Sequence, residues 1–260
     1  AEIGEIFGEW NKGRLNSYLI EITEKVLKAT DPETGKPVVD IIVDAAGQKG
    51  TGKWSAIEAQ NLAVTASGIE AAVAGRVLSS LREERMAAEK LFGLPALAEA
   101  PADKAAFIAD LENALLAAKI AAYAQGFAVM SSASEEFNWS LPMPTIARIW
   151  RAGCIIRSQF LDEITSAFTK DPNVPNLVVT PAFAQMVKET DGALRRVVAH
   201  AALAGLPVPA IASALSYFDT YRRGRGTANL IQAQRDFFGA HGFDRLDGKD
   251  LHHGPWAGQF

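Results

Sequence analysis

Residues 103–137 read DKAAFIADLENALLAAKIAAYAQGFAVMSSASEEF, and this stretch decides the fold. Its apolar residues recur three and four positions apart, a spacing that places them along one face of a helix. Alanine is its commonest residue, and small side chains at helix contacts let two helix axes approach closely. The stretch therefore predicts a long helix that packs tightly against other helices.

The same helical period continues along most of the chain, whereas strand-like alternation is almost absent. It occurs in further segments at residues 15–27, 55–64, 69–92, 144–168, 181–204, 209–221 and 229–239. The apolar run at residues 38–43 has the composition of a strand, but it is short and has no evident pairing partner. The expected fold class is all-α.

Composition excludes several classes of protein. With 260 residues, 48% hydrophobic and 22% charged, the chain is globular rather than disordered or disulfide-rich. A formal net charge of -4 argues against nucleic acid as a general partner. The single cysteine, Cys154, can form no intramolecular disulfide, which favours a cytoplasmic protein. The most apolar stretch, residues 114–130, is interrupted by Lys119 and Gln125, so we expect no membrane span.

The two ends of the chain differ from its middle. Helical spacing begins within the first residues with no capping residue ahead of it, which suggests that a segment upstream of Ala1 has been removed. Residues 242–260 lack apolar periodicity, yet they contain Trp256 and Phe260, two aromatic residues that are costly to leave in water. We expect these residues to form an extended tail that docks on another surface.

A repeat relates two parts of the sequence. Four residues of the first part match four of the second at an offset of 143, and five more match at 142: Ile3, Ile6, Phe7 and Arg14 match Ile146, Ile149, Trp150 and Arg157, and then Tyr18, Leu19, Glu21, Ile22 and Thr23 match Phe160, Leu161, Glu163, Ile164 and Thr165. One single-residue gap reconciles the two offsets, so the sequence predicts two related helical halves.

A glycine-rich stretch at residues 47–54, GQKGTGKW, is a candidate anion-binding loop. It nearly matches the P-loop pattern, but Trp54 stands where a hydroxyl should bind Mg²⁺, and the chain supplies no sheet to support an NTPase. The backbone N–H groups of such a turn, beside Lys49 and Thr51, could cradle an anion. A solvated, flexible turn is the alternative.

Two arginines lie on the apolar stripes of predicted helices. Arg76 falls close to Ile69 and Val73 on one helical wheel, and Arg235 falls between Ile231 and Phe238 on another. Either guanidinium could capture a phosphate. The alternative is an internal ion pair, with candidate partners Glu83, Glu84 and Asp236. The sequence contains no zinc motif, no complete GxGxxG and no GxSxG.

Residues 42–54, IVDAAGQKGTGKW, resemble the specific signature of the 6-phosphogluconate dehydrogenase family. Further stretches resemble that family in the same order: 9–13 (EWNKG), 81–85 (LREER), 123–127 (YAQGF), 149–157 (IWRAGCIIR) and 229–236 (NLIQAQRD). The resemblance covers nearly the whole chain, but only the C-terminal part of the family. It implies an all-helical substrate-binding and dimerisation domain of two repeats at residues 1–241, and a tail at 242–260 that docks on the partner subunit.

The family's N-terminal part is not found in this sequence. In the family it holds the Rossmann domain for NADP and a catalytic lysine and glutamate. The resemblance therefore implies that this polypeptide alone oxidises no substrate and does not fully bind NADP. The family belongs to the pentose phosphate pathway and to gluconate utilization. It oxidises 6-phosphogluconate with NADP, and then releases CO₂ to give ribulose 5-phosphate.

The resemblance also implies residue roles. Lys49 and Thr51 match the substrate-binding loop, and Arg76 matches an arginine that holds the substrate phosphate. Arg235 and His241 match two residues that are donated across a homodimer interface into the neighbouring subunit's site. The tail is similar to a short version found in the family and lacks the extension that some members lay over the neighbour's cofactor. A ligand-free helical dimerisation module is the alternative function.

Overall fold

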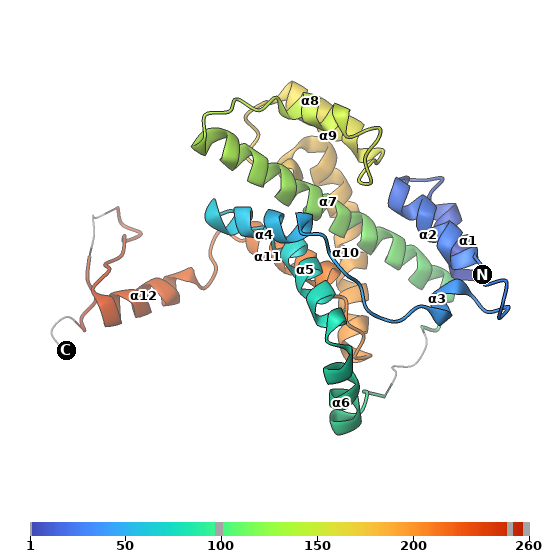
Figure 1. Ribbon diagram of the computed structural model, residues 1–260. Coiled ribbons are helices and arrows are strands. Elements are labelled where there is room, and N and C mark those ends of the chain that lie inside the picture. The colour runs from blue at the N-terminus through green and yellow to red at the C-terminus, as the bar shows by residue number, and fades with distance from the viewer. Residues whose placement is uncertain (1, 97–100, 249–251, 257–260) are drawn as a thin grey trace. The chain divides into compact units, whose positions relative to one another are not determined.

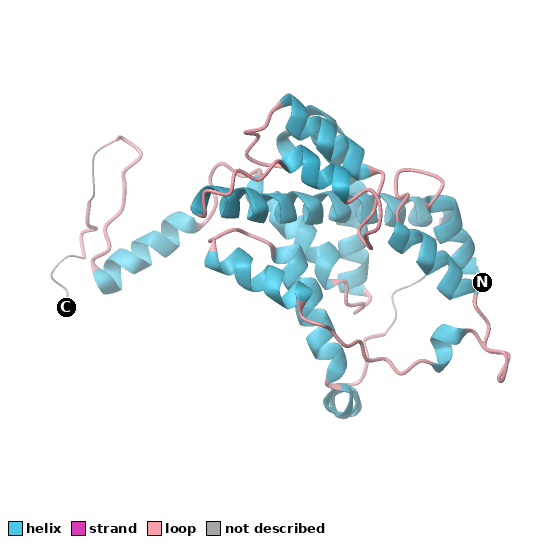
Figure 2. Ribbon diagram, turned by 45° about the horizontal axis from the view of Figure 1, so that its top comes forward, coloured by secondary structure: helices cyan, strands magenta, loops and turns pink. Residues whose placement is uncertain are grey.

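The chain folds entirely into helices and loops within the residues described by the computed structural model, which are 2–96, 101–248 and 252–256. Figure 2 shows these helices and the loops that join them. The helices are α1 (Glu2–Trp10), α2 (Tyr18–Lys28), α3 (Val38–Ile41), α4 (Thr51–Asn61), α5 (Ser67–Ser80), α6 (Arg82–Phe92), α7 (Lys104–Glu136), α8 (Met143–Ile149), α9 (Phe160–Lys170), the 3-10 helix η1 (Leu177–Val179), α10 (Pro181–Leu203), α11 (Pro209–Tyr221) and α12 (Ala228–Gly239). The all-α prediction is confirmed.

The long helix predicted over residues 103–137 is α7, which forms the centre of the core (Figure 1). Asp103 caps it by accepting a hydrogen bond from the Ala106 N–H at 2.9 Å. On its buried face Ala114 and Ala117 pack against Leu194 and Val197 of α10. The alanines let the two helices pack closely, as the sequence predicts.

Helix α7 is also long and apolar enough, by length and composition, to cross a membrane, although residues 114–130 contain Lys119 and Gln125. The core helix of a soluble protein passes the same test. In this fold α7 packs against α5 and α10, and its most apolar window is 44% buried inside the protein. These contacts favour a core helix, and the absence of a membrane partner stays a prediction.

The predicted repeat has a structural counterpart. Helices α1 and α2 pack together, as do α8 and α9, and α2 and α9 each have 11 residues. The two pairs meet where Ser17 and Ser158, just before these helices, form an isolated antiparallel bridge. Arg157 then donates to Glu21 Oε2 at 2.6 Å, which joins a residue of one repeat to a residue of the other.

Two local expectations were wrong. The 69–92 segment is two helices rather than one, because the Ser79 and Ser80 hydroxyls bond to carbonyls three residues earlier and the chain turns at Leu81. The 144–168 segment is also broken, by a turn in which Gly153 has φ of 70°. The strand-like run at residues 38–43 begins with the helical turn α3.

The chain divides into two compact units, Ala1–Tyr217 and Phe218–Phe260. The sequence predicts a boundary between residues 241 and 242, which lies after the boundary between these two units. The difference has a physical reason, because α12 is bonded to the tail that follows it: the Asp236 carboxylate accepts hydrogen bonds from the Gly242 and Gly254 N–H groups. Helix α12 and the tail therefore form one unit.

Candidate functional site

The glycine-rich loop leads directly into helix α4. Gly50 is the N-cap of this helix and adopts φ of 115°, which residues with a side chain rarely adopt. A Cβ added at Gly50 would lie 3.3 Å from the Trp54 ring, a tight contact that would make the indole shift by a few tenths of an ångström. Trp54, which breaks the P-loop pattern, thus packs over the turn, and the described residues contain no strand behind it.

The start of α4 presents several donors to solvent. Its first internal hydrogen bond is donated by Trp54 N–H to Gly50 O, so the preceding N–H groups of residues 51–53 open the helix. The side chains of Lys49, Thr51 and Lys53 are exposed at the same place. N–H groups, a hydroxyl and two cations at a helix N-terminus form an arrangement that suits an anion.

Helices α5 and α6 hold the loop in place. Arg76 of α5 donates to the Gly47 carbonyl, and the Ser79 hydroxyl accepts from the Ala46 N–H at 2.9 Å. Arg85 of α6 donates to the Asp44 carbonyl at 2.6 Å and to its carboxylate at 3.1 Å. The chain is therefore held at Asp44, Ala46 and Gly47, just before Lys49, and of the glycine-rich stretch at residues 47–54 these bonds hold Gly47.

Arg76 lies beside the loop but is more exposed than the helical wheel predicts. Its neighbours Val77 and Leu78 are exposed as well, so this end of α5 lies at the surface. The alternative of an ion pair with Glu83 or Glu84 is not realised within the described residues, where the guanidinium bonds to a backbone carbonyl. The Nη2 group of Arg76 thus bonds to the loop, and the other N–H groups of its guanidinium can bind a ligand.

The second unit carries Arg235 and His241, both exposed. Arg235 donates to Gln232 Oε1 at 3.0 Å, one turn earlier on α12. His241 follows Ala240, which ends the helix in the left-handed conformation with φ of 49°. The ring of His241 lies edge-on to that of Phe238, with centroids 6.1 Å apart.

Asp236 is not the partner of Arg235. Asp236 is 3% exposed, and its carboxylate accepts four hydrogen bonds, from the Gly242 and Gly254 N–H groups, the Trp256 indole and the His253 ring. Burial by itself raises the pKa of Asp236, but these hydrogen bonds outweigh burial and hold the pKa well below its usual range. Asp236 therefore carries its charge as the centre of the tail fold.

The tail folds back on its own unit within the described residues. Phe243 and His252 exchange backbone hydrogen bonds of 2.9 and 3.0 Å. Trp256 packs against Phe237 and Phe243, with ring centroids 6.0 and 6.4 Å apart. The expectation of a tail without helix holds for this part, while Phe260 lies outside the described residues. Docking of the tail on a partner stays a prediction.

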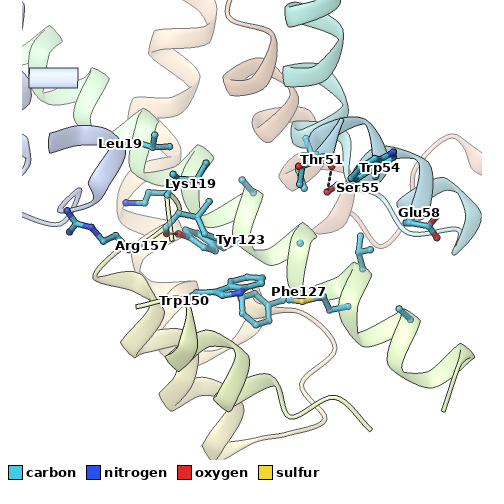
Figure 3. Close-up of a pocket in the computed structure, with 18 of the residues that line it drawn as sticks. Leu19, Thr51, Trp54, Ser55, Glu58, Lys119, Tyr123, Phe127, Trp150 and Arg157 are labelled. Atoms are coloured by element: carbon cyan, nitrogen blue, oxygen red, sulfur yellow. Dashed lines mark hydrogen bonds between the residues drawn. The ribbon is translucent and has the colours of Figure 1, made fainter. Parts of the chain in front are cut away.

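The first unit also contains a cavity of about 900 Å³ that the sequence did not predict. Figure 3 shows aromatic side chains of α7 and of the turn after α8 along its wall, with Thr51 and Trp54 of α4 at the other side. Burial lowers the pKa of Lys119 to about 8 and raises the pKa of Tyr123 to about 12. In the sequence, Lys119 stood out as a charge that interrupts an apolar helix face.

Glu163 of α9 lies near Lys119. Burial, and then the charge of Asp162, raise the pKa of Glu163, while the charge of Lys119 lowers it. Its Oε2 is buried and has no hydrogen-bond partner among the described residues. Lys119 Nζ instead reaches Leu15 O at 3.4 Å and lies 5.0 Å from the centre of the Phe160 ring. The cavity thus combines apolar walls with one poorly neutralised cation.

The fold and these features define a class: an all-helical domain that presents cations and helix N–H groups around a fixed glycine-rich loop. The model of the 6-phosphogluconate dehydrogenase C-terminal domain matches residues 1–256. The chain belongs to this family of oxidoreductases, as its resemblance implied. The roles that the resemblance gave to Lys49, Thr51, Arg76, Arg235 and His241 remain proposals.

Individual relatives agree with the family model. The chain is 47% identical over 255 residues to an NADP⁺-dependent decarboxylating 6-phosphogluconate dehydrogenase of Bacillus subtilis, covering 98% of this chain and 54% of that protein. It is 45% identical over 256 residues to an NAD⁺-dependent one from the same organism, covering 98% of this chain and 55% of that protein. The chain spans about half the length of these relatives.

A solved structure is similar over the same extent. The 6-phosphogluconate dehydrogenase of Plasmodium falciparum, described in its apo form, with NADP⁺ and with 6-phosphogluconate, superposes with a TM-score of 0.94 at 40% sequence identity. The match covers 98% of this chain and 55% of that protein. The helical architecture of the family is therefore present in this chain.

Proposed function

We propose that this chain is the substrate-binding and dimer-forming domain of a cytoplasmic, decarboxylating 6-phosphogluconate dehydrogenase. One observation carries the proposal: Arg76 is bonded to the same loop whose last residues, Lys49 and Thr51, stand at the open N-terminus of α4. Two cations, a hydroxyl and free N–H groups suit a phosphate dianion. The relatives are named for a substrate that carries such a group.

The contribution of this domain to the reaction is positional. A phosphate fixed at the loop sets the place of the sugar-acid carbons, so that the reacting carbon can meet a nicotinamide held elsewhere. A Rossmann fold for NADP requires a strand before its glycine-rich turn, and the described residues contain no strand. The nicotinamide would accept the hydride, and the residues described here would bind and orient the substrate.

Calorimetric titration of 6-phosphogluconate into the chain tests the binding proposal. Saturable binding is expected, and Arg76→Ala and Arg235→Ala should each weaken it by about 1.5 to 3 kcal/mol, the value of a hydrogen bond to a charged group. Arg148→Ala is the matched control, because Arg148 is an exposed arginine on α8 that no proposed contact involves. Equal affinity for all four proteins would remove these assignments, and no binding by a folded dimer would favour the ligand-free dimerisation module.

Helix α12 supports the dimer. Leu230, Ile231 and Phe238 are 61%, 57% and 68% exposed, and they flank Arg235 on a helix of only 12 residues. Such an apolar face is costly in water and is typical of an interface. We propose that a second copy of the chain covers it, which would bring Arg235 and His241 of one copy to the phosphate loop of the other.

The oligomeric state tests this proposal by light scattering. Ile231→Asp places a charge in the proposed interface and is expected to convert a dimer into a monomer, because a buried unpaired carboxylate costs several kcal/mol. Leu91→Asp is the matched control, since Leu91 is 75% exposed on α6 and lies outside the proposed face. A dimer that persists in Ile231→Asp, or a wild-type monomer, would contradict the proposal.

A further inference from the structure

The two candidate ligand residues of the second unit share one hydrogen-bond network. Gln232 Oε1 accepts from the Arg235 guanidinium at 3.0 Å, and Gln232 Nε2 donates to the Gly242 carbonyl at 2.6 Å. One amide side chain thus connects Arg235 to the residue that follows His241. Its two ends have opposite hydrogen-bonding character, so the orientation of the amide suits both partners at once.

Asp236 fixes His241 from both sides. The Ala240 N–H donates to the Asp236 backbone carbonyl at 2.8 Å, and the Gly242 N–H donates to its carboxylate at 2.7 Å. His241 therefore stands between two peptide groups bonded to one residue. Ala240 completes this tight turn in the left-handed conformation, which a residue with a side chain adopts uncommonly and keeps where the surrounding structure holds it.

The same carboxylate fixes the tail over the helix. Its Oδ2 accepts from the Gly254 N–H at 2.9 Å and from the Trp256 indole at 2.8 Å, and Oδ1 also contacts His253 Nδ1 at 2.7 Å. A Cβ at Gly254 would lie 2.1 Å from the Trp256 ring, so the indole packs directly on the glycine backbone. A buried charge with four donors holds one backbone arrangement strongly, because any departure leaves the carboxylate unsatisfied.

We propose that Gln232 and Asp236 are positioning residues that hold Arg235 and His241 in a fixed mutual geometry for the substrate. Neither side chain would touch the substrate. Gln232 would act through the Arg235 guanidinium and the Gly242 carbonyl, and Asp236 through the backbone on both sides of His241. This inference rests on the proposed function, in which a second copy brings Arg235 and His241 to the substrate. As the family resemblance implies, it places Arg235 at the phosphate and His241 at the sugar-acid end.

The test compares binding of 6-phosphogluconate and of inorganic phosphate to four variants of the whole chain. Asp236→Asn should weaken 6-phosphogluconate about tenfold or more, because a displaced ligand group costs binding at the reacting end. Inorganic phosphate, which has no sugar-acid end, should be affected less. Gln232→Leu should weaken both ligands. Gln234→Leu is the matched control on the same helix, with an exposed side chain, and Trp256→Phe removes a single donor from Asp236.

A double-mutant cycle separates positioning from general stability. If Asp236 acts through His241, Asp236→Asn should change the affinity for 6-phosphogluconate less than about twofold in a His241→Ala background. Hydrogen exchange at residues 240–244 should accelerate in Asp236→Asn while α7 and α10 stay protected. Should Asp236→Asn disorder the whole chain, Trp256→Phe supplies the same cycle with His241→Ala, and Gln232→Leu supplies a matching cycle with Arg235→Ala.

The outcomes distinguish two failures. Binding by the wild type, with losses from Asp236→Asn and His241→Ala that simply add, would overturn this inference and leave the proposed function intact. Absence of 6-phosphogluconate binding by a folded wild-type dimer would overturn the binding function, and this inference with it. Non-additive losses, with the Gln234→Leu variant unchanged, would support both.

Discussion

Phe127→Ala is expected to lower the free energy of unfolding of the first unit by about 3 to 5 kcal/mol, the usual cost of truncating a buried phenylalanine. Phe127 is 1% exposed. Its ring centroid lies 5.6 Å from that of Trp150 and 5.2 Å from that of Phe168. It therefore joins α7 to α9 and to the turn after α8, and its loss affects three segments at once.

The site of Phe127 cannot close easily after truncation. Phe127 also lines the cavity of about 900 Å³, so the removed volume would add to a space that already exists. Phe92→Ala is the matched control, because Phe92 is 81% exposed at the end of α6. Urea unfolding followed by circular dichroism, at one protein concentration, measures both variants. A loss below about 1 kcal/mol for Phe127→Ala, equal to the control, would contradict the role assigned to this ring.

The sequence predicted the helices well because their signals are local. Helix α7 carries a clear apolar period from Asp103 onward, and α11 begins and ends at the predicted residues. The breaks at Leu81 and around Gly153 were missed, because they arise from serine hydroxyls bonding to the backbone and from one left-handed glycine. Neither event interrupts the apolar period that the prediction used.

The candidate site also has features that the sequence predicts and features that it does not. The loop with Lys49 and Thr51 could be found from its glycines and lysines, and Arg76 from its place on a helical wheel. The hydrogen bonds that hold the loop involve Arg85 and Asp44, which are 41 residues apart, and no periodicity relates such positions. The sequence offers Asp236 as a partner for Arg235, its neighbour. Its actual partners lie up to 20 residues later in the tail.

Lys119→Met is expected to stabilise the chain near neutral pH and to remove one pH dependence of its stability. The ordinary pKa of a lysine is 10.5, and burial lowers the pKa of Lys119 to about 8 in the folded protein. Between pH 8 and pH 10.5, Lys119 is therefore protonated in the unfolded chain and deprotonated in the folded chain. Stability therefore rises with pH across this window, and below it the buried ammonium costs about 3 to 4 kcal/mol.

The other titrating groups set the range of the measurement. Burial raises the pKa of Tyr123 from 10.0 to about 12, so the unfolded chain loses this proton first and stability falls above pH 10. Burial also raises the pKa of Glu163, the carboxyl group near Lys119. Denaturant unfolding between pH 7 and 9.5 isolates the contribution of Lys119.

The slope of the free energy of unfolding against pH tests this prediction better than the free energy of unfolding at one pH. Methionine has a similar length and keeps the apolar contacts of the lysine stem. It loses the hydrogen bond to Leu15 O and the cation over the Phe160 ring. It also leaves Glu163 without a nearby cation. These losses offset part of the gain at every pH in the range. The wild type should therefore gain stability from pH 7 to 9.5 by an amount that Lys119→Met lacks, whereas Lys188→Met, at an exposed position on α10, should keep the wild-type slope. Equal slopes in all three proteins would mean that the Lys119 ammonium is solvated, and that the cavity beside it admits water to the middle of α7.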